Sequence, residues 1–154
     1  MEGTFYWVGS LPLEPGSIVM PGNWYRLVSS IPGHNCALRE MIYEQVRQEK
    51  FSHLPSRMSA IFLCSSQNDM EIFLQKNPRP LDILYEVELI DASPGICTVD
   101  SDLAALQNMQ DGGRLYSINE YTQNAEAYWT SASSTSLQSP EVITESPIRI
   151  IRRL

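Results

Sequence analysis

The sequence has few of the residue types on which many metalloproteins and small secreted proteins depend. Its 154 residues include 3 cysteines and 2 histidines. The cysteines, Cys36, Cys64 and Cys97, are odd in number and irregularly spaced, which argues against a disulfide framework or a zinc site. His34 and His53 have no carboxylate or cysteine at ligand spacing, so neither is a candidate metal ligand or general base. We expect no metal site, and reduced thiols as in a cytoplasm.

Positive charge is also scarce. The chain has 11 Lys and Arg residues against 18 Asp and Glu residues, a net charge of −7. Sequence-independent binding to nucleic acid needs clustered positive charge, so this balance argues against it. The one dense basic cluster, Arg149, Arg152 and Arg153, lies at the C-terminus. An anionic ligand would therefore be held locally, by a few Arg side chains or backbone N–H groups.

Long apolar segments are missing as well. No run approaches the length needed to cross a bilayer, and the N-terminus lacks the basic and then apolar pattern of a signal peptide. We therefore expect a cytoplasmic protein without a membrane partner, and an effector delivered by a signal-independent route would look the same. The length predicts a single domain over residues 1–154 with one core.

Several common catalytic motifs do not occur. There is no Gly-rich phosphate loop, Rossmann fingerprint, HExxH pair, nucleophile elbow or CxxC pair. Hydride transfer, nucleotide hydrolysis at a Walker site and zinc hydrolysis are therefore disfavoured. A Ser/His/acid triad has no support from spacing.

The most informative segment that is present is the run FSHLPSRMSAIFLCSSQNDMEIFL, residues 51–74. Pro55 ends what precedes it, and residues 60–64 form an apolar run of strand length. Ser66, with Asp69 three residues later, predicts the start of a helix. The end of a strand that leads into a helix N-terminus is a common place for ligands, and the simpler alternative is that both elements only fill the core.

The remaining pattern predicts short strands with helices between them. On the helix expected from Asn35 to about Lys50, Leu38, Ile42 and Val46 form the apolar stripe, and charged residues such as Arg39 and Glu40 lie elsewhere. Because strands and helices do not alternate, the order indicates an α+β fold. Further strands are expected over residues 4–8, 17–20, 83–90, 141–144 and 148–151, further helices from 100 or 101 to 109 and from 119 to 129, and loops over 29–34 and 130–139.

A tight turn at Pro21-Gly22-Asn23 is followed by two flat side chains. The Trp24 indole and the Arg26 guanidinium can flank a planar ligand, since both stack and Arg adds hydrogen-bond donors. A Trp at this position also commonly fills the edge of a core. The two interpretations carry similar weight here.

Three segments together resemble the ADP-ribosyltransferase family, in particular its small single-domain bacterial and phage members similar to rifampin ADP-ribosyltransferase. Residues 5–10, FYWVGS, with the following Leu, Gly and Pro-Gly, resemble the opening Tyr-His-Gly-Thr strand. Residues 59–63, SAIFL, resemble the aromatic strand that precedes a helix. Residues 140–150, with PEVIT and PIRI, resemble the closing strand and its leading glutamate.

The resemblance implies a fold and a set of roles. The fold would be α+β, with small mixed or antiparallel sheets and helices packed between and around them, and the substrate would be NAD. Trp7, Gly9 and Ser10 would lie where the family holds the adenosine ribose and the nicotinamide amide. Phe62 would stack on nicotinamide. Glu141 would bind the nicotinamide-ribose hydroxyl and stabilise an oxocarbenium-like transition state.

Two positions depart from the family pattern. Trp7 falls near the family's His and cannot make its hydrogen bonds, and Phe62 replaces a Tyr and lacks the hydroxyl. Of the family's trio, Glu141 alone is kept. The lost polar contacts are then replaced, or the cleft binds a nucleotide without efficient transfer. The candidate replacements are Asn23, Arg26, Ser56 and Arg57.

The sequence thus leads to the hypothesis of mono-ADP-ribosyl transfer from NAD to an unidentified acceptor, as in a bacterial or phage effector or toxin. Nicotinamide would lie between Phe62 and Trp7 or Trp24, and Glu141 beneath the reacting ribose. Arg57 and Arg26 would contact the pyrophosphate, and the loop 130–139 would help to select the acceptor. The alternatives are a non-catalytic module that binds nucleotide or protein, and an NAD glycohydrolase with water as the acceptor.

Overall fold

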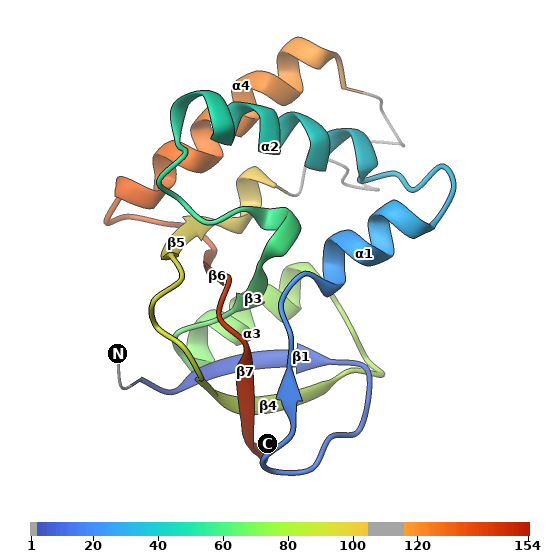
Figure 1. The fold of residues 1–154 in the computed structure, drawn as a ribbon, viewed down its shortest axis with the longest axis vertical. Helices are drawn as coiled ribbons and strands as arrows, with labels where there is room; N and C mark the ends of the chain where they lie inside the picture. Colours follow the sequence, from blue (N-terminus) through green and yellow to red (C-terminus); the bar gives the residue numbers. More distant parts are fainter. Residues whose placement is uncertain (1–2, 105–115) are drawn as a thin grey trace.

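Two antiparallel sheets and a layer of helices stack on one another in a computed structural model that describes residues 3–104 and 116–154. In Figure 1 the first sheet lies at the bottom, the second sheet in the middle and helices at the top. The first sheet has the order β1 (Phe5–Gly9), β4 (Ile83–Leu89), β7 (Ile148–Arg153), β2 (Ile18–Val19). The second has the order β3 (Ile61–Leu63), β6 (Pro140–Thr144), β5 (Ile96–Asp100).

Two of the helices cover the second sheet, whereas α3 contacts β1 of the first sheet. Figure 1 shows α2 and α4 running side by side over one face of this sheet, with α1 to one side. The α-helices are α1 (Asn23–Ser30), α2 (Ala37–Lys50), α3 (Gln67–Lys76) and α4 (Ile118–Thr130). Short 3-10 turns are η1 (Arg57–Ser59), η2 (Ser101–Leu103) and η4 (Ser131–Ser133).

The expectation of one core was wrong, because a separate apolar core lies on each face of the second sheet. Successive side chains of a strand point to opposite faces, so Ile61 and Leu63 pack against the first sheet, whereas Phe62 points toward the helices. On β6, Val142 belongs to the core between the two sheets, and Ile143 belongs to the core beneath the helices. The second sheet therefore separates these two groups of side chains.

The two sheets meet at their edge strands β1 and β3. Tyr6 and Cys64 form an isolated antiparallel bridge, with N–H to carbonyl distances of 2.9 Å in both directions. This bridge places the end of β3, and the helix α3 that follows, beside the first strand of the chain. The N-terminus of α3 is capped as expected, because the Ser66 hydroxyl accepts a hydrogen bond from the Asp69 N–H at 3.0 Å.

The α+β prediction is confirmed, and several element boundaries are corrected. The segment after Gly22, where φ is +94°, is the helix α1 and was not expected to be helical. Strand β5 was also not expected. Helix α4 is capped by Ser117 in a capping box with Glu120, two residues before the expected Asn119. The part of the expected helix around Met109 lies outside the described residues.

The buried face of α2 differs from the expected stripe. Ile42 and Val46 are buried as predicted, but Leu38 is 45% exposed. Arg39 and Glu40, which were expected on the outside, are buried. The prediction was wrong because it assigned charged residues to solvent, whereas these two find partners of opposite charge inside the protein.

The segment after α4 is more firmly attached than the expected surface loop. Ser131 and Ser139 are both buried. The Asp100 carboxylate accepts hydrogen bonds from the Gln138 and Ser139 N–H groups at 3.1 and 3.3 Å. The end of this segment, directly before Glu141, is therefore fixed to β5.

Candidate functional site

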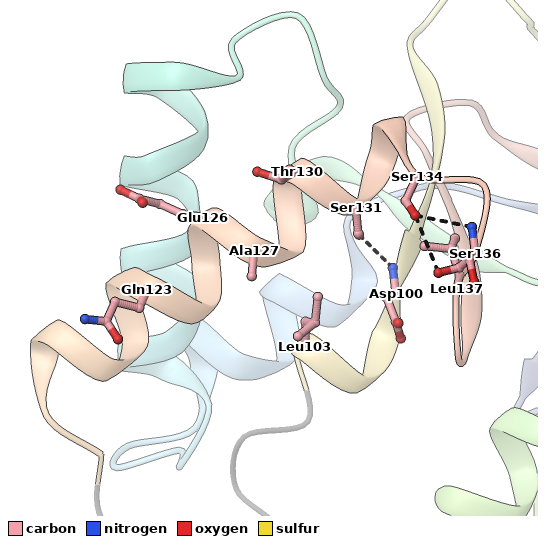
Figure 2. Close-up of a pocket in the computed structure, with 10 residues that line it drawn as sticks. All are labelled: Asp100, Leu103, Gln123, Glu126, Ala127, Thr130, Ser131, Ser134, Ser136 and Leu137. Carbon is pink, nitrogen blue, oxygen red and sulfur yellow. Dashed lines mark hydrogen bonds between the residues drawn. The ribbon is translucent and has the colours of Figure 1, made fainter.

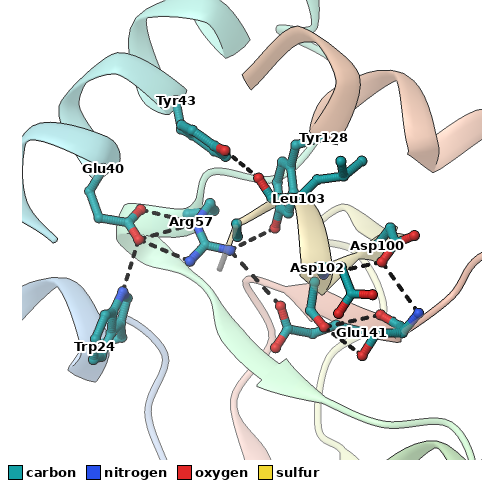
Figure 3. A network of polar contacts seen from close by, with 12 residues as sticks. Trp24, Glu40, Tyr43, Arg57, Asp100, Asp102, Leu103, Tyr128 and Glu141 are labelled. Carbon is teal, nitrogen blue, oxygen red and sulfur yellow. Dashed lines mark hydrogen bonds and ion pairs between the residues drawn. The ribbon is translucent and has the colours of Figure 1, made fainter. Parts of the chain in front are cut away.

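A buried polar cluster lies between the β3-β6-β5 sheet and the helices, as Figure 3 shows. Its members come from different parts of the chain and are joined by hydrogen bonds and ion pairs. We call it the Arg57 cluster, and it consists of Trp24, Arg39, Glu40, Arg57, Tyr128 and Glu141.

Arg57 is the centre of the cluster. Ser56 caps the short turn η1 by accepting a hydrogen bond from the Met58 N–H, and this turn directs the Arg57 side chain into the interior, where it is 6% exposed. Its Nε and Nη2 donate to Glu40 at 3.0 and 2.9 Å, and its Nη1 donates to the Tyr128 hydroxyl at 2.7 Å. All three guanidinium nitrogens are thus engaged within the protein.

The Arg57 guanidinium also contacts two aromatic rings. Its central carbon lies 4.8 Å from the centre of the Phe62 ring and 5.2 Å from that of Tyr128. A cation over an aromatic face is attracted by the ring, and more strongly when both are desolvated. These contacts fix the plane of the guanidinium between β3 and α4.

Glu40 is the ionised carboxylate of the cluster. Besides Arg57, it accepts hydrogen bonds from the Trp24 indole at 3.0 Å and from Arg39 at 2.9 Å, and it is 1% exposed. Burial alone raises its pKa, but the charges of Arg57 and Arg39 and the hydrogen bonds from Arg57 and Trp24 together lower the pKa to about 2. A carboxylate this well paired is held as an anion at every physiological pH.

Glu141 is the opposite case. It lies on β6 opposite Val99, on the same face as Ile143 and Phe62, and is 8% exposed. Within the described residues, the Glu141 side chain has one polar contact, with Arg57 Nη1 at 3.9 Å, and its carboxyl oxygens accept no hydrogen bond. Burial raises its pKa, and the charge of Arg57 opposes this only in part. Glu141 is therefore a buried carboxyl group whose oxygens are not used by the fold.

The structure brings three of the predicted site residues together. Phe62, Arg57 and Glu141 share one face of the second sheet, and Trp24 joins them through Glu40. Trp24 also meets His34 edge to face at 5.7 Å. The aromatic ring, the cation and the carboxylate predicted for one site are in fact neighbours.

Trp7 and Gly9 lie elsewhere. Trp7 stacks on Tyr85 with ring centres 5.7 Å apart, in the core between the two sheets. Its indole covers Gly9 so closely that a Cβ at this position would overlap the ring. Ser10 is exposed at the end of β1. The second sheet separates Trp7 from Phe62 and Glu141, so the three do not line one groove in this structure.

The remaining candidates already have structural partners, Asn23 and Arg26 on the surface and Ser56 in a partly buried position. Arg26 donates to the Asn23 side chain at 2.8 Å on exposed α1, and the Asn23 amide donates to the Met20 carbonyl at 3.3 Å. The Ser56 hydroxyl donates to Glu44 at 2.7 Å. These residues belong to caps and local ties outside the Arg57 cluster.

Sequence reasoning missed three members of the cluster, Arg39, Glu40 and Tyr128. Tyr128 lies in the helix expected from 119 to 129, but no pattern in the sequence gives it a polar partner. A signal for Glu40 exists only in hindsight, because it lies about one turn before Tyr43 on the buried side of α2. Nothing in the sequence pairs it with Arg57, which is 17 residues away.

A pocket of about 610 Å³ opens beside this region, between α4, η2 and the segment after η4. Figure 2 shows Glu126, Thr130 and several serines around it. Two carboxylates on its wall already have partners, since Asp100 binds backbone N–H groups and Glu126 pairs with Lys50 at 2.5 Å. The other residues that line it are three serines and a threonine, the apolar Leu103, Ala127 and Leu137, and Gln123. We call it the serine-rich pocket, and it lies beside the segment that leads into Glu141.

Two kinds of feature do not occur in the described residues. No three His, Cys, Asp or Glu side chains are grouped there as metal ligands would be, and the three cysteines are free thiols. None of the helices in the same part of the chain is both long enough and apolar enough to span a bilayer.

The sequence that forms this site matches a known protein family. Residues 22–154 match the family described as "Protein of unknown function (DUF2441)". The chain belongs to the DUF2441 family. The matched region contains every member of the Arg57 cluster, whereas β1 with Trp7 precedes it. No curated protein matches the chain.

Proposed function

We propose that this DUF2441 protein is an NAD-dependent mono-ADP-ribosyltransferase in which Glu141 acts on the nicotinamide ribose. The observation that supports this most is that Glu141 is buried beside Phe62 without a hydrogen bond among the described residues. A buried carboxylate normally has donors around it, and one without them at a strand start is a candidate for chemistry. The sequence resemblance assigns the same residue this role.

The reaction suits a site with one carboxylate and one aromatic ring. The bond between C1′ of the ribose and the nicotinamide nitrogen breaks, nicotinamide leaves with the electron pair, and the sugar becomes cationic. An acceptor nucleophile then bonds to C1′ and loses its proton to solvent. An ionised Glu141 stabilises the positive charge, and a nicotinamide immobilised against Phe62 is oriented for departure, so no metal is required.

The contacts of Arg57 revise its role. Its nitrogens are bound to Glu40 and Tyr128, so it acts as the electrostatic neighbour of Glu141 and not as a pyrophosphate ligand. It also covers one face of Phe62, which leaves the rest of the ring for nicotinamide. Because Glu141 is 8% exposed, neighbouring side chains have to move apart when NAD binds. The serine-rich pocket beside β6 is then the place for part of the acceptor.

A specific observation favours a second candidate, a non-catalytic binding module. Trp7 and Phe62 lie on opposite sides of the second sheet, and the donors of Arg57 are satisfied internally. Such a protein would keep the fold and use its surface to bind nucleotide or protein. Either function belongs in a cytoplasm, where NAD and reduced thiols coexist, and an effector delivered into a host cell meets the same conditions.

The test is incubation of the purified protein with NAD labelled in the adenylate part, with and without cell extract as a source of acceptor. Label on a macromolecule or small acceptor means transfer, and nicotinamide release alone means NAD hydrolysis. Neither product means the binding module. Glu141→Gln should abolish turnover, and Glu88→Gln, which removes an exposed carboxylate paired with Arg149 at 2.7 Å, should not. Turnover that survives in Glu141→Gln contradicts the assignment.

A further inference from the structure

Arg57 lies between two carboxylates and treats them unequally. Its Nε and Nη2 bind Glu40 side-on at 3.0 and 2.9 Å, a bidentate geometry. Its remaining nitrogen, Nη1, donates to Tyr128 and stays 3.9 Å from Glu141. Both residues are buried, although the Glu141 side chain is 10% exposed and the Glu40 side chain 1%. The guanidinium is held toward its hydrogen-bond acceptors, Glu40 on α2 and Tyr128 on α4.

Without these anchors the guanidinium would bind Glu141. Arginine pairs with carboxylates bidentately wherever the geometry permits, and a buried carboxylate without donors is costly. Glu40 and Tyr128 accept all the hydrogen bonds of the Arg57 nitrogens that are seen here. They are fixed in turn, Glu40 by Trp24 and Arg39, and Tyr128 by its place in the core.

We propose that Glu40 is a positioning residue. By binding two nitrogens of Arg57, it keeps the guanidinium from binding the carboxylate of Glu141, whose oxygens remain available to a substrate hydroxyl. Arg57 then contributes charge to the site without blocking it. Glu40 does not touch the substrate. The identity of that hydroxyl, on the nicotinamide ribose, rests on the proposed function, whereas the competition between the two carboxylates does not.

The charged groups around Glu141 allow a clean measurement. The positive groups are Arg57 from η1, Arg39 from α2 and Arg79 after α3, and the negative group is Glu40. Two further neighbours titrate at higher pH: burial raises the pKa of the Cys64 thiol to about 12, and burial also raises the pKa of the Tyr128 hydroxyl. Because the pKa of Glu40 is about 2, a titration step of this cluster at a pH between that of Glu40 and that of Cys64 is the titration of Glu141.

The experiment is a pH titration of side-chain carboxyl signals by NMR, in full-length protein labelled with ¹³C at the Glu carboxyl carbon. Glu141→Gln identifies the signal. In Glu40→Gln the pKa of Glu141 should fall, because a like charge is removed and Arg57 turns toward Glu141. In Arg57→Gln it should rise. Tyr128→Phe, which frees Nη1 alone, should also lower it and serves if Glu40→Gln does not fold.

The matched control is Glu44→Gln. Glu44 lies one turn further along α2 and forms its own partly buried ion pair, with Arg47 at 2.7 Å, but does not belong to the Arg57 cluster. A general destabilisation of α2 would shift the pKa of Glu141 in the same direction in Glu40→Gln and in Glu44→Gln. Removal of a negative or a positive charge alone also shifts the pKa of Glu141 in opposite directions in Glu40→Gln and Arg57→Gln. Tyr128→Phe removes no charge, so a lower pKa of Glu141 in this variant, with none of the shift in Glu44→Gln, is the result that the proposed competition alone gives. A pKa of Glu141 that is unchanged or raised in Tyr128→Phe overturns the proposal.

Nicotinamide release separates this proposal from the proposed function. If the protein consumes NAD, Glu40→Gln should lower the rate by roughly tenfold or more, because Arg57 then occupies the oxygens that orient the ribose. The acid limb of the pH profile should move to lower pH together with the NMR titration. Shifted titrations without NAD turnover in any variant leave the role of Glu40 intact and refute the transferase. Turnover with an unmoved titration refutes the role of Glu40 alone.

Discussion

Arg57 lies 2.9 Å from one oxygen of Glu40 and 3.9 Å from one oxygen of Glu141. The pKa values of these two buried carboxyl groups are shifted in opposite directions: the pKa of Glu40 is lowered to about 2, whereas burial raises the pKa of Glu141. Pairs of titratable groups whose environments move their pKa values apart are typical of sites that do acid, base or electrostatic chemistry. Here the separation is built by residues from α2, η1, α4 and β6.

The first prediction concerns stability in acid. Because the folded pKa of Glu40 lies below its ordinary value of 4.5, its stabilisation is fully present above pH 4.5. It should be lost as the pH falls from 4.5 toward 2. Urea unfolding at a series of pH values over this range should show the loss in the wild-type protein. Glu40→Gln, which starts less stable, should show a shallower slope, and an equal slope in the two proteins contradicts the prediction.

The second prediction concerns the removal of the central cation. Arg57→Met leaves Glu40 without its main partner in a buried site, and breaking a buried pair costs about 3–5 kcal/mol. Arg149→Met removes an exposed pair with Glu88 and should cost at most about 1 kcal/mol. Free energies of unfolding from urea titrations compare the two. A loss of similar size in both variants would mean that Arg57 is not the centre of the cluster.

The third prediction concerns the effect of the buried Glu141 carboxyl group on thermal stability. The pKa of Glu141 is raised in the folded state, so its contribution is favourable below pH 4.5 and is lost as the pH rises through the folded pKa. Glu141→Gln should therefore melt at a higher temperature than the wild type at neutral pH, by about 2–4 °C for each kcal/mol gained in a protein of this size. The difference should shrink as the pH is lowered. Thermal unfolding at pH 4 and pH 8 measures it.

The parts of the fold that follow from local rules could be predicted. The strand expected over 83–90 is β4, whose alternation buries Tyr85 and Val87 and turns Glu88 outward, and the Ser66 cap follows from one hydroxyl and one N–H three residues apart. Strand β5 was missed because its five residues are few and run directly into Asp100 and Ser101, which are typical of the start of a helix, and α1 because its Pro-Gly start is equally typical of a turn. Local sequence patterns predict an element where they favour one type of structure. Where they favour two types equally, as in β5 and α1, packing against the rest of the protein determines the structure.

The candidate site was predictable only in part, for a different reason. Phe62, Arg57 and Glu141 were identified as candidates, and the structure brings them together. The pairing of Arg57 with Glu40 spans two elements and has no local signature, so the burial of a charged pair could not be seen. The position of Trp7 was also hidden, since whether a residue on β1 faces one core or the other depends on how the two sheets stack.

The fourth prediction tests the placement of Trp7. Gly9→Ala should destabilise the protein by about 1–3 kcal/mol, because a Cβ at Gly9 would overlap the Trp7 ring and disturb its stacking on Tyr85. The control is Gly3→Ala, whose Cβ would meet Phe5 at an ordinary 3.6 Å and should be nearly neutral. The NMR titration of Glu141 should be the same in both variants. A changed Glu141 titration in Gly9→Ala would place Trp7 closer to the site than the structure does.

The fifth prediction concerns the segment that leads into Glu141. Asp100 accepts hydrogen bonds from the Gln138 and Ser139 N–H groups, so Asp100→Ala leaves two backbone donors near the start of β6 without partners. Loss of such buried acceptors costs about 1–3 kcal/mol and should act locally first.

Hydrogen exchange of the two amides measures this directly. Exchange at Gln138 and Ser139 should be faster in Asp100→Ala, while amides in the centre of β4 keep their protection unless the whole protein is destabilised. Asp102→Ala is the control, because Asp102 lies two residues away and its exposed side chain pairs with Lys76 at 2.8 Å. If transfer to an acceptor is observed, Asp100→Ala should impair it more than nicotinamide release, since the segment borders the serine-rich pocket. Equal protection in the two variants would show that Ser101, whose N–H and hydroxyl also bind Ser139, holds the segment alone.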